Sequence, residues 1–128
     1  MTSVEVPYSI ASALPSLTVL DITNEVRREL GASDRESGIA YVTPLDDVAV
    51  VRVQERESGF FCDLEDLLTR LVPQEEPDRG RLLCMLLGPR GEQIPFSAGE
   101  LCLGRWQRIL LVDFEAPDEP RWNLTLLG

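Results

Sequence analysis

The chain has 128 residues, 44% of them hydrophobic and 27% charged, which is typical of one domain with its own hydrophobic core, so we expect a single domain over residues 1–128. Its net charge of −10 argues against nonspecific nucleic-acid binding and against anionic membrane surfaces, because both need a basic face. No histidine is present, which excludes Ser-His and Cys-His nucleophile pairs and removes the commonest zinc ligand.

The first half of the chain combines apolar stretches of strand length with one short helical pattern. Ile22, Val26 and Leu30 recur every four residues after a run of capping side chains, which predicts a helix over about residues 22–30. The stretches that we expect to be strands are residues 4–6, 17–20, 39–42 and 47–53.

The second half opens with a longer helical pattern. Phenylalanine and leucine side chains recur at intervals of three and four over residues 60–71, and Pro73 ends the pattern. The strands expected after it are residues 81–87, 93–96, 101–112 with an interruption at Gly104, and 122–127. Because the links are of hairpin length, the sequence predicts an α+β fold of largely antiparallel β-sheets in a sandwich with two helices.

Segments that would place the chain outside the cytoplasm are absent from the sequence. No run of about 18 apolar residues predicts a membrane span, and the first residues lack the basic start and apolar block of a signal peptide. Cys62, Cys84 and Cys102 lie in apolar stretches without a CxxC spacing, which favours buried, reduced thiols. We therefore expect a cytoplasmic protein with no cofactor and no transition metal.

The most specific pattern in the chain lies between residues 99 and 107. It resembles the GxLxLGxWQ signature of the YjbQ-like family, whose members are described as secondary thiamine-phosphate synthase-like proteins. The residues that carry it are Gly99, Leu101, Leu103, Gly104, Trp106 and Gln107. Further similarities follow in order over residues 17–128, among them Asp21-Ile22-Thr23 and Arg70-Leu71-Val72-Pro73. The resemblance implies one YjbQ-like domain, a YjbQ-like fold and a homotrimer.

The chain departs from the family pattern where the family has histidines. Counting back from Glu55 places Asp46 at the histidine of the family's His-Thr-Thr-Ala motif, and counting back from Gly88 places Arg81 at a second histidine. A third belongs to a loop that is here cut to residues 74–80. The resemblance therefore implies a divergent member that lacks the family's histidine-based site.

Two functional hypotheses remain open. In the first, the chain is a degenerate YjbQ-like protein, a pseudoenzyme that binds an unknown small anionic ligand or has only a structural role. In the second, it is a thiamine-phosphate synthase-like enzyme that works with substituted residues. The catalytic residues are unknown, and the candidates for ligand binding are Asp46, Asp47, Glu55, Arg81, Arg105, Trp106, Gln107 and Arg121.

The charges of these candidates allow more than one role. The three acids among them either hold a hard cation such as calcium or magnesium or belong to a polar turn. The arginines either bind a phosphate or carboxylate or pair with the surplus acids at the surface. If Asp46 and Arg81 replace two histidines of one cleft, we expect them within direct or water-bridged reach, with Gln107 or Glu55 nearby and Arg79 as the alternative partner, since opposite charges in a partly enclosed site stabilise each other.

Overall fold

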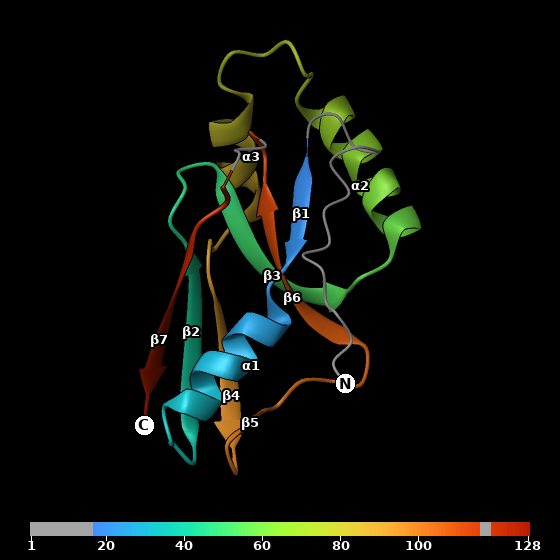
Figure 1. Ribbon diagram of the computed structural model, residues 1–128. Helices are drawn as coiled ribbons and strands as arrows, with labels where there is room; N and C mark the ends of the chain where they lie inside the picture. Colours follow the sequence, from blue (N-terminus) through green and yellow to red (C-terminus); the bar gives the residue numbers. More distant parts are fainter. Residues whose placement is uncertain (1–16, 116–118) are drawn as a thin grey trace.

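The computed structural model describes residues 17–115 and 119–128, which form two antiparallel sheets and three helices (Figure 1). The first sheet has the order β1 (Thr18–Asp21), β6 (Gln107–Asp113), β3 (Ala49–Glu55). The second has the order β5 (Glu100–Leu101), β4 (Glu92–Ser97), β2 (Gly38–Pro44), β7 (Trp122–Leu127). The helices are α1 (Thr23–Ala32), α2 (Ser58–Leu71) and α3 (Arg79–Leu87). The predicted α+β class is confirmed, and the strand expected at residues 4–6 lies outside the described residues.

Strand β6 is the centre of the first sheet. It pairs with β1 on one side and β3 on the other, so that Leu111 lies opposite both Leu20 and Val51. Ile109, Leu110 and Leu111 are fully buried, because both faces of this sheet are covered. This explains why residues 109–112 form an unbroken apolar run rather than an alternating one.

Two cores lie on the two faces of the first sheet. The helix-side core lies between that sheet and helices α2 and α3, and its buried residues are Leu17, Val19, Val50, Phe61, Leu68, Val72, Leu83, Leu110, Val112 and Phe114. The inter-sheet core joins the two sheets and α1, and its buried residues are Ile22, Val26, Leu30, Ala40, Val42, Ala49, Val51, Ile94, Phe96, Ile109 and Leu111. Figure 1 shows α1 beside the second sheet and α2 beside the first.

The second sheet buries only one of its faces. In β7, Trp122, Leu124 and Leu126 pack against the inter-sheet core, whereas the residues between them are exposed. The alternation of polar and apolar residues in this strand predicts that arrangement.

Residues 81–87 form a helix, so the strand predicted there is wrong and the helix count rises from two to three. A short apolar run fits a buried strand and a helix equally well, because its periodicity does not separate them. Of this run, Leu83, Cys84 and Leu87 contact the helix-side core, a spacing of one helical turn. Gly88 follows with a φ of 79°, a left-handed conformation that glycine adopts at helix ends without steric strain.

Arg52 of β3 holds the end of this third helix. Its guanidinium group donates hydrogen bonds to the carbonyl oxygens of Val51 and Pro89, both at 2.8 Å, and of Leu87 at 2.5 Å. One side chain therefore joins the first sheet, the last residue of α3 and the loop that leads to β4.

The cysteines are free, but they are not the buried thiols that the sequence indicates. Cys62 and Cys102 are exposed and Cys84 is half-buried. Cys62 lies on the solvent side of α2, where an apolar neighbourhood in the sequence does not mean an apolar neighbourhood in space. In the parts of the chain that the structure describes, no helix is long and apolar enough to cross a bilayer.

Candidate functional site

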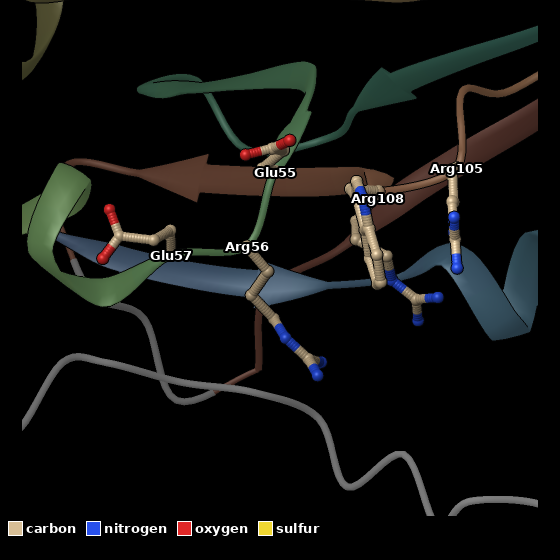
Figure 2. Close-up of a pocket in the computed structure, with 6 residues that line it drawn as sticks. Glu55, Arg56, Glu57, Arg105 and Arg108 are labelled. Atoms are coloured by element: carbon tan, nitrogen blue, oxygen red, sulfur yellow. The ribbon is translucent and has the colours of Figure 1, made fainter.

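A pocket of about 570 Å³ lies where β3 leads into α2, beside the start of β6 (Figure 2). It is lined by Glu55, Arg56, Glu57, Arg105, Trp106 and Arg108, and we call it the arginine pocket. Figure 2 shows the three arginine side chains extending to one side, away from the carboxylates of Glu55 and Glu57. The Glu57 carboxylate caps helix α2, since it accepts hydrogen bonds from the N–H groups of Gly59 at 2.7 Å and Phe60 at 2.9 Å.

A buried carboxylate orients two of these arginines. Asp21 accepts hydrogen bonds from Arg108 Nε at 2.7 Å and from Arg56 Nη1 at 3.0 Å. Burial opposes the ionisation of Asp21, but hydrogen bonds from Arg108 and from the side chain and N–H group of Thr23 outweigh it, so the pKa of Asp21 lies below its usual value. An ionised Asp21 therefore holds both guanidinium groups in place.

Thr23 links that carboxylate to the central strand. Its hydroxyl donates to Asp21 Oδ1 at 2.7 Å and accepts from the N–H group of Ile109 at 2.7 Å. Since Ile109 directly follows Arg108, the position of Arg108 is fixed through the backbone as well as through its own side chain.

The signature residues build the turn at the other side of the pocket. Gln107 accepts a hydrogen bond from the N–H group of Gly104 at 2.6 Å, and a Cβ at Gly104 would lie only 3.0 Å from the Gln107 side-chain oxygen. Residues 102–106 therefore separate β5 from β6, where the sequence predicts one strand over residues 101–112 with an interruption at Gly104. This turn exposes 65% of Trp106 and places the Arg105 guanidinium 5.0 Å from its ring centroid.

A second pocket, of about 500 Å³, lies beside α3. Its lining residues are Asp47, Asp78, Arg81, Leu82, Cys84, Met85, Gly88 and Arg90. Arg81 lies 3.4 Å from Asp78, an exposed pair one helical turn apart. The structure thus divides the candidate residues, with Glu55, Arg105 and Trp106 at the arginine pocket and Asp47 and Arg81 at the second one. Gln107 instead stabilises the turn of the signature through its hydrogen bond with Gly104.

Asp46 has a different partner from the one expected. Its carboxylate accepts hydrogen bonds from the Arg121 side chain at 3.3 Å and from the Arg121 N–H group at 3.2 Å, and its carbonyl oxygen accepts one from Arg90. The described residues contain no direct ion pair between Asp46 and Arg81, since Arg81 pairs with Asp78. The alternative partner, Arg79, is buried and donates to the Val72 carbonyl oxygen at 2.9 Å. Arg81 lies on helix α3 and not on the strand predicted at residues 81–87, so its side chain does not have the position that the prediction of this pair requires.

The side chain that sequence reasoning missed is Asp113. It ends β6 with 1% of its surface exposed, and its Oδ1 accepts the N–H group of Glu115 at 2.8 Å. Burial and the neighbouring Asp46 together raise the pKa of Asp113 to about 6, against the hydrogen bond from the Glu115 N–H group, which lowers it. The signal available in the sequence was an acidic residue directly after a long apolar run. A charged side chain at such a place is expected to be buried and to need a partner.

Asp46 and Asp113 differ in their surroundings. Asp46 is partly open to solvent and lies against Arg121, whereas Asp113 is buried and its pKa is raised to about 6. Within residues 17–115 and 119–128, no group of three or more cysteine, aspartate or glutamate side chains has the arrangement of a metal site.

Comparison with known proteins identifies the family. Residues 12–128 match the family model described as UPF0047 protein YjbQ-like. A UPF0047 protein of Archaeoglobus fulgidus is 32% identical over 108 residues, which are 77% of this chain and 82% of that protein. A UPF0047 protein of Mycobacterium tuberculosis strain H37Rv is 32% identical over 118 residues, 84% of this chain and 86% of that protein.

Solved structures agree with this match. The hypothetical protein APE1520 of Aeropyrum pernix has a TM-score of 0.77 at 29% identity, over 88% of this chain and 90% of that one. A YjbQ/UPF0047 family protein of Clostridium acetobutylicum shares the fold with a TM-score of 0.79 at 22% identity, over 95% and 99% of the two chains. The chain belongs to the UPF0047 family of YjbQ-like proteins. The relatives carry names that assign no activity.

The Asp21 network gives a testable expectation for stability. Replacing Asp21 with Asn should lower the free energy of unfolding at pH 7 by about 2–3 kcal/mol, less than for fully buried pairs because both arginines reach solvent. A lowered pKa means that this stabilisation is present above the usual aspartate value and is lost as the pH falls through the folded value. Urea unfolding at pH 7 and pH 3 should therefore show a difference between wild type and Asp21→Asn that shrinks in acid.

The matched control is Glu25→Gln, which removes an exposed carboxylate 3.9 Å from Arg28. It should change the free energy of unfolding by less than about 0.5 kcal/mol at either pH. An equal loss at both pH values for Asp21→Asn would contradict the ionised network.

Proposed function

We propose that this UPF0047 family member is a ligand-binding pseudoenzyme whose arginine pocket takes a small ligand with a phosphate or carboxylate group. The observation that carries the proposal is the gathering of Arg56, Arg105 and Arg108 around one pocket beside the exposed ring of Trp106. Guanidinium groups bind phosphate and carboxylate through paired N–H donors, so a pocket lined by three arginines can take an anion even in an acidic protein.

Preorganisation supports this assignment. Asp21 and the Thr23–Ile109 hydrogen bond hold Arg108 before any ligand arrives, so less side-chain entropy is lost on binding. Arg105 has no ion pair within the described residues and lies 5.0 Å from the Trp106 ring centroid, which leaves its guanidinium group available to an anion. The Trp106 face would stack on a planar group attached to the anion.

Binding measurements test the pocket. We expect calorimetric titration with inorganic phosphate, pyrophosphate and thiamine monophosphate to detect binding, and Arg105→Gln to weaken it about tenfold, as the loss of one charge-assisted contact does. Trp106→Ala should weaken the binding of thiamine monophosphate more than the binding of inorganic phosphate, because only thiamine monophosphate has rings that can stack on the indole.

Arg28→Gln is the matched control, since it removes an exposed arginine of α1 outside the pocket. It should leave all three affinities unchanged. If Arg105→Gln behaves like this control, the arginine pocket is not the anion site.

The alternative function is thiamine-phosphate synthesis with substituted residues. General acid–base catalysis contributes about 10² to 10⁴ in rate, and a chain without imidazole forfeits it unless carboxyl groups replace it. Among the described residues, the pair of Asp46 and Asp113 favours this alternative. A turnover assay beside a histidine-bearing family member decides it, and a comparable rate would refute the pseudoenzyme.

A homotrimer is the oligomeric state that we propose, and we place the protein in the cytoplasm without nucleic-acid or membrane partners. Support for assembly comes from apolar side chains that remain exposed on α2 and α3, led by Met85 with 83% of its surface accessible. The other exposed apolar residues of these helices are Phe60, Leu67, Leu71, Leu82 and Leu86. Free, exposed cysteines fit a reducing compartment.

Light scattering coupled to size exclusion tests the assembly. A trimer should have a mass of about 43 kDa, three times the 14.3 kDa of one chain. Met85→Glu should lower that mass if this helix surface forms the contact, since an unpaired charge would be buried there. A wild-type mass near 14 kDa at micromolar concentration would rule the trimer out.

A further inference from the structure

Two carboxyl groups lie near each other where the two sheets join. This place is at the opposite end of β3 and β6 from the arginine pocket. Asp113 is at the end of β6 and Asp46 is in the loop between β2 and β3, and a hydrogen bond of 3.0 Å from the Phe114 N–H group to the Val48 carbonyl oxygen brings the two segments together. The Oδ2 atom of Asp113 is buried and has no hydrogen-bond partner among the described residues. Since carboxylates only accept hydrogen bonds, two ionised groups cannot satisfy that oxygen.

We propose that Asp46 and Asp113 form a proton-binding site, in which one shared proton on Asp113 is hydrogen-bonded between the two carboxyl groups. A single proton converts two repelling acceptors into a donor and an acceptor, and it removes the unpartnered buried oxygen. The proton comes from solvent and returns to it, so no other reactant is needed.

The surrounding groups decide which of the two carries the proton. Arg121, on the segment before β7, lies 3.3 Å from the Asp46 carboxylate, and 17% of the Asp46 side chain reaches solvent. Asp113 has no cationic side chain bonded to it in the described residues, and the nearby Glu115 carboxylate and the Asp46 charge both disfavour its ionised form. From α3 and the loop after it, Cys84 and Arg90 also lie beside this site, and Arg52 of β3 is a further charge near Cys84.

Proton uptake at this site would hold four segments together. The loop of Asp46 is bonded to the segment after β6 through the Phe114 N–H group and the Val48 carbonyl oxygen, at 3.0 Å. It is bonded to the segment before β7 through the Leu45 N–H group and the Arg121 carbonyl oxygen, at 2.9 Å, and to the α3–β4 loop through Arg90. With the proton bound, Asp113 is neutral and does not repel Asp46. Above about pH 6, the negative charge of Asp113 repels Asp46 and weakens the connections between these segments.

Carbon-detected NMR titration of the aspartate carboxyl groups tests the proposal directly. In the wild type, the Asp113 resonance should titrate near pH 6, and in Asp46→Asn its midpoint should fall by about one pH unit or more, because a repelling acceptor becomes an amide donor. Asp47→Asn removes the same charge one residue away, and it should leave the Asp113 midpoint in place.

Thermal unfolding provides a second readout. A raised folded pKa means that the stabilisation is complete below the usual aspartate value and is lost as the pH rises through about 6. The wild-type Tm should therefore fall between pH 5 and pH 7, and Asp113→Asn should flatten that fall and have the higher Tm at pH 8.

Three results would overturn the proposal. An Asp113 midpoint near the ordinary value of 3.8 would show that no proton is retained. An elevated midpoint that persists in Asp46→Asn would show that burial alone raises it, without sharing. A stoichiometric shift of both resonances on addition of calcium or magnesium would show that the site binds a metal cation in place of the proton. If Asp113→Asn fails to fold, the titration of Asp46→Asn still decides the question.

Discussion

The ionised carboxylate of Asp21 is the group on which the arrangement of this molecule depends. It lies at the end of β1 and receives hydrogen bonds from α1, from the segment after β3 and from β6. A buried charge is costly without partners, so the sequence has to supply Thr23, Arg56 and Arg108 together. The same contacts fix the direction in which α1 leaves the first sheet. They also set the two arginines at the edge of a pocket, so one interaction determines both the chain path and the character of the surface.

Much of this architecture is readable from the residues. The run at residues 109–112 predicts a strand covered on both faces, and the alternation in residues 122–127 predicts one covered on a single face, because burial leaves a direct mark on composition. The helix periods of α1 and α2 are equally plain, since Val26 and Leu30, and Phe61 and Leu68, recur at whole turns toward a core. The signature at residues 99–107 predicts the family, and its Gly104 predicts the interruption between β5 and β6.

What escaped prediction depends on contacts between segments distant in sequence. Helix α3 has apolar residues on more sides than the core covers, so its composition imitates a buried strand. Asp113 and Asp46 lie close together only because β6 and the β2–β3 loop end at the same place, and no local sequence pattern predicts that proximity. For the same reason the candidate residues do not share one site: three line the arginine pocket, two line the second pocket, and Asp46, Gln107 and Arg121 line neither. Residue types name the available chemistry, whereas the topology decides which of them share a site.

Arg52 shows how a single planar group can join several parts of a fold. The carbonyl oxygens of Val51, Leu87 and Pro89 point toward it from a strand, a helix end and a loop, and a guanidinium group has N–H donors along two edges to reach them all. Lysine has the same charge, but its ammonium group is a compact point charge and not a rigid, planar array of donors. A substitution scale based on charge or polarity would therefore misjudge this position, because the quantity that matters at residue 52 is the shape of the donor array.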